Sequence, residues 1–287
     1  MALGPEDLVL CAGTLARVPL RERVAIAAGA GFGGISLFLD DLAGARRSGL
    51  SDADLRALLD DHGLQVAELD PLMRWVPESE EGRATAEGEG FLRWGEQDFY
   101  DAAEAVGARS INAVLFARRP VAESRLIEAF AGLCDRAREH GLLVHLEFMP
   151  FSQVRDVASA LSVAEQAGRS NGGVMFDVWH HYRGGGSAEA MRRAAPRVLG
   201  IQLDDAPAQA ESNPVEETLH RRLLPGEGDA GVAELIRILD VGGCRAPLGV
   251  EVFCDDLASL PAAEVAQRCA DATRRVVAEA RAVPREA

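Results

Sequence analysis

The sequence predicts a (β/α)8 barrel, and two observations lead to that prediction. Eight short apolar runs alternate with longer amphipathic segments from one end of the chain to the other, which is the element order of such a barrel. The chain has 287 residues, of which 48% are apolar, enough for a core of that size. No Pro- or Ser-rich linker interrupts residues 1–287, so we expect a single domain.

The expected strands are brief and continuously apolar, as are strands buried on both faces of a parallel sheet. In order they are residues 8–13, 34–39, 65–70, 110–116, 143–149, 173–179, 199–205 and 248–253. An open doubly wound sheet would share this alternation. The barrel is favoured because no GxGxxG motif follows the first strand.

The expected helices fill the gaps between these strands. They cover residues 20–32, 52–63, 96–108, 123–141, 154–168, 188–195, 231–243 and 262–281. Ser51 and Asp54 have the spacing of a capping box, and Gly63 is a natural stop for the same helix. The long polar connections 75–95 and 206–228 are expected on the catalytic face, where barrel insertions usually lie.

Composition and charge exclude several classes of protein. Lys and Arg total 30 against 45 Asp and Glu, a formal charge of −15 that disfavours binding to nucleic acid or to anionic membrane surfaces. The five cysteines are scattered without CxxC spacing, which suits a reducing compartment. No basic n-region opens the chain and no apolar run approaches the ~18 residues of a membrane span. We therefore expect a cytoplasmic protein.

Four polar residues interrupt apolar runs on the last four expected strands. They are Glu147, Asp177, Gln202 and Glu251. Because barrel chemistry occurs at the C-terminal strand ends, we expect these side chains to converge there. Three carboxylates at one place would repel one another strongly without a cation, so a divalent ion is expected. The all-oxygen donor set favours Mn²⁺ or Mg²⁺ over a zinc site.

Two basic residues follow this pattern. His180 comes three residues after Asp177 and is expected to donate a hydrogen bond to the substrate beside the metal; the alternative is a loop histidine that caps a helix. Arg222 precedes a Pro- and Gly-rich turn and could bind a substrate oxygen or anion through its planar guanidinium. The alternative for Arg222 is a surface basic residue that offsets local acids.

These motifs resemble the xylose-isomerase-like superfamily of barrels, also described as sugar phosphate isomerases and epimerases. The resemblance covers nearly the whole chain and is most specific in LEFMP, FDVWH, IQLDD, RLLPGEGD and VEVF. In the ketose 3-epimerases of that superfamily, the matching Glu, Asp, His and Glu hold a divalent metal, often Mn²⁺. The two glutamates also exchange the substrate proton, while the histidine and the arginine bind substrate oxygens.

Carried over, the resemblance implies four metal ligands, Glu147, Asp177, Gln202 and Glu251. It implies Glu147 and Glu251 as the catalytic acid and base, and His180 and Arg222 as substrate contacts. The chain departs from the epimerases at Gln202, where they usually have His. A Gln in that place resembles the dehydroshikimate dehydratase branch.

The sequence thus predicts a metal-dependent isomerase or epimerase that abstracts a proton next to the carbonyl of a small keto-sugar or keto-polyol, through a metal-stabilised enediolate. Mn²⁺ is the expected cofactor, with Mg²⁺ or Co²⁺ as alternatives.

A lyase of the same superfamily is the main competing function: an inosose or dehydroshikimate dehydratase, or an enzyme of β-elimination from a keto-glycoside. A non-catalytic barrel subunit is the remote alternative. An apurinic-site endonuclease is disfavoured by the −15 charge and by only six histidines. A homo-oligomer is left open.

Overall fold

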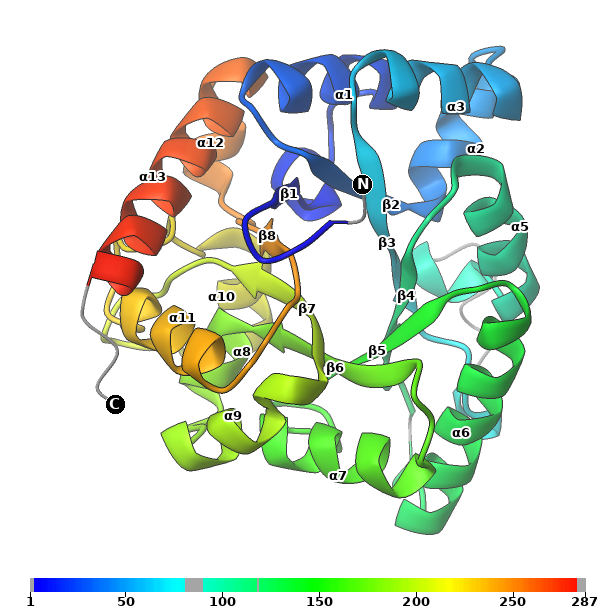
Figure 1. Cartoon of the computed structure of the whole chain (residues 1–287), viewed down its shortest axis with the longest axis vertical. Coiled ribbons are helices and arrows are strands. Elements are labelled where there is room, and N and C mark those ends of the chain that lie inside the picture. The colour runs from blue at the N-terminus through cyan, green and yellow to red at the C-terminus, as the bar shows by residue number, and fades with distance from the viewer. Residues whose placement is uncertain (1–2, 81–89, 118, 283–287) are drawn as a thin grey trace.

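Eight parallel strands close into a barrel, with helices around its outside (Figure 1). The computed structural model describes residues 3–80, 90–117 and 119–282. Each strand pairs with the next along the chain, and β8 pairs with β1 to close the ring. The strands are β1 (Leu8–Leu10), β2 (Gly34–Phe38), β3 (Gln65–Leu72), β4 (Ser110–Val114), β5 (Leu143–Glu147), β6 (Gly172–Asp177), β7 (Val198–Leu203) and β8 (Leu248–Val250). The predicted barrel is confirmed.

Each of the eight expected helices has a counterpart. These are α1 (Leu20–Gly29), α3 (Asp52–Asp61), α5 (Glu96–Val106), α6 (Glu123–Glu139), α7 (Val157–Ala167), α9 (Ala188–Ala194), α11 (Val232–Val241) and α13 (Ala262–Ala282). The capping box at Ser51 is present: its hydroxyl accepts a hydrogen bond from the Asp54 amide, while the Asp54 carboxylate accepts one from the Ser51 amide.

Within the described residues, four further helices were not predicted, and each of them lies between the end of a strand and the next expected helix. They are α2 (Leu39–Arg47), α8 (Val178–Arg183), α10 (Pro214–His220) and α12 (Asp255–Ala258). Short 3-10 turns also occur at Ala12–Leu15, Pro77–Glu80, Gly90–Arg93 and Ala195–Arg197. The residues of α8 continue the apolar run of β6, which is why the strand was expected to extend to residue 179. Helix α10 lies in the long connection 206–228. Residues 81–89 of the other long connection, 75–95, lie outside the described residues.

The barrel interior narrows where glycines face bulky neighbours. A Cβ added at Gly200 of β7 would lie 2.7 Å from the ring of His145, and one at Gly249 of β8 would lie 2.4 Å from the backbone oxygen of Ile201. The absence of a side chain at Gly200 therefore leaves room for the His145 ring in the interior below the strand ends, and the absence of one at Gly249 lets β7 and β8 approach closely. Within the described part of the chain, no helix combines the length and apolarity needed to cross a bilayer.

Candidate metal centre and substrate cavity

Four strands carry the expected metal ligands to one mouth of the barrel. Glu147 is the last residue of β5 and Asp177 the last of β6, while Glu251 follows β8 directly. Gln202 of β7 pairs in register with Asp177, so the two side chains point to the same side of the sheet. All four residues are buried. The parallel sheet thus brings the predicted residues to its C-terminal end.

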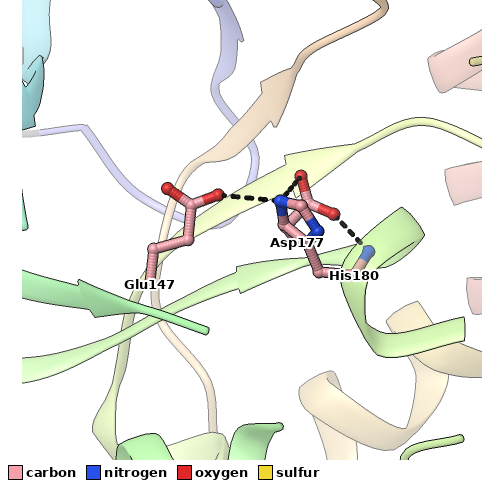
Figure 2. A group of neighbouring side chains, drawn as sticks. All are labelled: Glu147, Asp177 and His180. Carbon is pink, nitrogen blue, oxygen red and sulfur yellow. Dashed lines mark hydrogen bonds and ion pairs between the residues drawn. The ribbon is translucent and has the colours of Figure 1, made fainter. Parts of the chain in front are cut away.

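Figure 2 shows how Glu147, Asp177 and His180 point toward one another. His180 Nε2 lies 3.4 Å from Glu147 Oε1 and 4.0 Å from Asp177 Oδ2. Asp177 also caps helix α8, because its Oδ1 accepts a hydrogen bond of 2.7 Å from the His180 amide. One ligand atom from each residue lies within 4.8 Å of the others, so these three residues form a group that could hold a metal ion. His180 therefore joins the candidate ligands, beyond its expected role as a substrate contact.

Asn112 was not among the expected residues, yet it organises one side of the site. Its Nδ2 donates to Asp70 Oδ1 at 2.8 Å and to Glu147 Oε2 at 2.6 Å. Burial, together with the nearby negative charge of Glu147, raises the pKa of Asp70 to about 8. The signal in the sequence was a carboxamide inside the apolar run SINAV, which the search for carboxylates passed over.

Arg222 lies among the carboxylates on the other side of the site. Its Nη1 donates to Asp177 Oδ2 at 2.8 Å and to Asp204 Oδ2, and lies 3.6 Å from Glu251 Oε2. Thr218 also holds the guanidinium, since its backbone oxygen accepts a hydrogen bond of 3.0 Å from Arg222 Nε. Arg222 is buried, which rules out a surface position. The guanidinium therefore holds Asp177 and Glu251 in place as well as facing the cavity described below.

The site contains more acids than this one arginine can neutralise. Burial alone would raise the pKa of Asp177, but attraction to Arg222 and His180 holds it below its usual value. Burial raises the pKa of Asp204 well above its usual value, with further repulsion from Asp177. Burial also raises the pKa of Glu251, against the attraction of Arg222. A bound cation would lower the cost of keeping such acids ionised.

Two of the expected ligands have buried polar atoms with no hydrogen-bond partner among the described residues. These are both amide atoms of Gln202 and Oε1 of Glu251. Unpaired buried oxygens are costly in a folded protein unless an ion or a ligand satisfies them. Oxygen donors at the mouth of a barrel match the ligands that hard divalent cations prefer. The residues present therefore fit a divalent metal.

A cavity of about 870 Å³ opens above these residues. Asp70, Glu147, His180, Arg222 and Glu251 contribute polar groups to its lining. Most of the remaining lining is apolar and comes from the loops that follow the strands. A buried polar floor beneath an open apolar wall is the usual form of a small-molecule site.

Comparison with known proteins identifies the family. A family model described as the xylose isomerase-like TIM barrel matches residues 24–276. The chain belongs to the xylose isomerase-like TIM barrel family. The membership agrees with the resemblance seen in the strand-end motifs.

Curated relatives of this xylose isomerase-like barrel catalyse different reactions. A 3-dehydroshikimate dehydratase of Pseudomonas aeruginosa is 27% identical over 249 residues, which make up 84% of this chain and 37% of that protein. An inosose isomerase of Halalkalibacterium halodurans is 27% identical over 157 residues, which make up 53% of this chain and 54% of that protein. The matched regions thus span about half of these relatives or less.

Solved structures share the fold of this xylose isomerase-like barrel over nearly the whole chain. The IOLI protein, crystallised with a zinc atom, has a TM-score of 0.81 at 20% identity and covers 95% of this chain and 98% of its own. A D-allulose 3-epimerase from Methylomonas sp. has a TM-score of 0.70 at 17% identity, covering 96% of this chain and 100% of its own. At these identities the likeness concerns the fold alone.

Proposed function

We propose that this barrel is a divalent-metal-dependent isomerase or epimerase that removes and returns a proton next to the carbonyl of a keto-polyol. The observation that carries the proposal is the buried group of Glu147, Asp177 and His180, whose ligand atoms lie within 4.8 Å of one another. Glu147 and His180 also line the cavity. The inosose isomerase relative supports a keto-polyol substrate, and the zinc atom in the IOLI structure supports a divalent metal.

We assign the metal to Glu147, Asp177, Gln202 and Glu251, with Mn²⁺ as the expected ion. His180 is close enough to Glu147 and Asp177 to be a ligand as well, but it lines the cavity and is assigned to the substrate; the His180→Ala experiment below separates the two roles. The unpaired buried oxygens of Gln202 and Glu251 support including these two residues. When bound, the metal supplies positive charge that withdraws electrons from the carbonyl oxygen and so acidifies the neighbouring carbon. Asn112 and Arg222 orient the carboxylates from outside through the hydrogen bonds described above.

The two glutamates are assigned the proton transfers. Glu147 and Glu251 come from strands three apart in the barrel, and both line the cavity. A substrate between them would lose a proton to one carboxylate and receive one from the other, which inverts or relocates a stereocentre. His180 and Arg222 line the same cavity and are assigned to the substrate oxygens.

The test is incorporation of solvent deuterium at the carbon next to the carbonyl of a ketose or an inosose, with Mn²⁺ present. We expect exchange by the wild type and a loss of at least about 100-fold in Glu147→Gln and in Glu251→Gln, because each variant removes a general acid or base, which contributes rate factors of that order, as well as a proposed metal ligand. Full exchange in both variants, with metal bound, would overturn the assignment. His180→Ala should slow exchange while calorimetry still detects Mn²⁺ binding; loss of the metal would instead make His180 a ligand.

A dehydratase is the second candidate, and two observations favour it. The 3-dehydroshikimate dehydratase relative matches 84% of this chain. Gln202 stands where the resemblance to that branch predicts Gln. The first proton abstraction would be the same, but a β-hydroxyl would then leave and form a conjugated double bond. An increase in ultraviolet absorbance with 3-dehydroshikimate or an inosose as substrate would show that a conjugated double bond forms. If, in addition, no solvent deuterium is incorporated into a recovered ketose, the protein is a dehydratase.

A further inference from the structure

The wall of the cavity is strongly apolar around its mouth. Phe116, Phe151, Val215 and Leu219 line it with 38–47% of their surface exposed. Only one other large apolar residue in the described chain is comparably exposed, Val241, which is not among the lining residues. Among the described residues, the exposed large apolar side chains are thus concentrated at this opening, and such a concentration marks a binding surface.

The apolar wall is built from several loops rather than from one accidental patch. Phe116 follows β4, Phe151 follows β5, and Phe253 follows β8. Val215 and Leu219 lie four residues apart on α10, so they share one face of that helix. Barrel function is concentrated in these strand-to-helix loops.

Aromatic rings of the wall touch the polar floor directly. The Phe151 ring packs edge-on to the His180 ring, with centroids 6.0 Å apart. The Arg222 guanidinium carbon lies 5.2 Å from the centroid of the Phe253 ring. The apolar wall and the proposed catalytic floor are therefore neighbouring parts of one cavity.

A free sugar does not match this wall. Each hydroxyl that loses water against an apolar surface without a hydrogen bond costs free energy, and a small ketose has hydroxyls along its whole length. An aryl or other apolar substituent would instead gain by leaving water there. The cavity volume of about 870 Å³ is in the upper part of the range for drug-sized ligands.

We propose that the substrate is amphipathic: a keto-polyol or sugar that carries an aryl or similarly apolar substituent. The hydroxylated end lies on the floor at Glu147 and Glu251, and the substituent lies against the wall at Phe116, Phe151 and Leu219. The placement of the hydroxylated end rests on the proposed function. The preference for an apolar substituent rests on the wall.

The test is calorimetric binding of two unreactive probes, phenyl β-D-glucopyranoside and methyl β-D-glucopyranoside, to the Mn²⁺-loaded protein. We expect the phenyl glycoside to bind at least about tenfold more tightly, since burial of one aromatic ring exceeds the roughly 1.4 kcal/mol of a tenfold change. The Phe116→Ala, Leu219→Ala double variant should lose most of this advantage while its methyl glycoside affinity stays unchanged. Val241→Ala, which removes a still more exposed apolar side chain outside the lining, is the matched control and should change neither affinity.

Three results would overturn the proposal: equal affinity for the two probes, no detectable binding of the phenyl probe, or an advantage that persists in the double variant. A fourth result would also overturn it: if the double substitution leaves both probe affinities unchanged but dissociates a dimer that the wild type forms in sedimentation, the wall covers a second copy of the chain. Neither probe has a carbonyl, so binding does not depend on proton transfer. Absence of deuterium exchange with the aryl preference intact would count against the proposed function alone.

Discussion

At the scale of single residues, Gln202 is the most informative side chain of the site. Its amide is buried next to Asp177 in the sheet, yet neither polar atom has a hydrogen-bond partner among the described residues. An amide oxygen is a harder donor than an imidazole nitrogen and leaves an NH₂ group free to contact a neighbouring oxygen. As a proposed ligand, Gln202 is therefore expected to affect which metal binds rather than the net charge of the site.

We predict that Gln202→His moves metal preference from Mn²⁺ toward Co²⁺ or Zn²⁺ by about tenfold in the ratio of affinities, because imidazole suits those ions better. Titration calorimetry of the three metals on both proteins measures this ratio. Gln166→His, at an exposed position on α7, is the control and should leave the ratio unchanged. An unaltered ratio in the Gln202 variant would show that Gln202 is not a ligand.

The reactivity of each cysteine depends on the burial of its own thiol. Four of the five thiols are buried, and only Cys254 is partly exposed. Burial raises the pKa of Cys244 to about 11 and that of Cys134 and Cys269 to about 12. At pH 8 the thiolate fraction of Cys244 is therefore on the order of one in a thousand, and that of the other two is smaller still.

We predict that one thiol of the native protein reacts rapidly with a disulfide reagent such as Ellman's reagent at pH 8, and that Cys254→Ser abolishes this phase. The slow thiols should react faster as the pH rises toward 11, because the thiolate fraction grows tenfold per pH unit below the pKa. Unfolding in denaturant should expose all five. Any fast thiol that remains in the native Cys254→Ser protein would contradict the burial of the other four.

At the scale of elements, the contact between β7 and β8 depends on Gly249. This glycine pairs with Gln202, and a Cβ there would lie 2.4 Å from the backbone oxygen of Ile201. The backbone of Ile201 is held in the sheet, so it cannot move aside as the end of a flexible side chain could. A side chain at position 249 would therefore push the two strands apart beside Gln202 and two residues before Glu251.

We predict that Gly249→Ala lowers the free energy of unfolding by about 2 kcal/mol, as overpacked cores do, and also weakens Mn²⁺ binding. Urea denaturation with and without Mn²⁺ measures both effects. Gly44→Ala on α2 is the matched control: apart from the backbone of its own helix, the nearest atom to its Cβ would be Arg47 Nη2 at 3.7 Å, so it should stabilise by about 0.5–1 kcal/mol. Unchanged stability in Gly249→Ala would mean that the strands separate at little cost.

At the scale of the whole molecule, the metal is expected to couple to folding. The proposed ligands come from β5, β6, β7 and the end of β8, residues up to about a hundred positions apart that meet only in the closed barrel. An ion that binds the folded chain and not the unfolded one stabilises it by mass action, about 2.7 kcal/mol when its concentration is 100 times the Kd.

We predict that Mn²⁺ at that excess raises Tm by about 5–10 °C over the protein in EDTA, from the usual relation between stability and Tm for chains of this size. Differential scanning calorimetry checks it. Glu147→Gln and Asp177→Asn should lose most of the shift, while Asp135→Asn, an acid on the outer helix α6, should keep it. Equal Tm values with Mn²⁺ and with EDTA in the wild type would contradict metal binding at this site.

The order of elements and the position of the site could be predicted from the sequence alone. Strands buried on both faces must be continuously apolar, so the eight runs were visible, and parallel strands bring their ends to one mouth, so Glu147, Asp177, Gln202 and Glu251 could be placed together. The short helices α2, α8, α10 and α12 could not be predicted. Residues 178 and 179 of α8, for example, read as a continuation of β6.

Only the tertiary structure decided which atoms face one another. Asn112 joins Asp70 to Glu147, and Arg222 joins Asp177 to Asp204. Several of these contacts span more than thirty positions in the chain. The apolar wall likewise needs side chains from loops after different strands. The periodicity of apolar residues in the sequence indicates the face of a helix or strand on which a side chain lies. A contact between distant segments depends instead on how all eight strands close into the barrel and on the few ångströms that separate their loops.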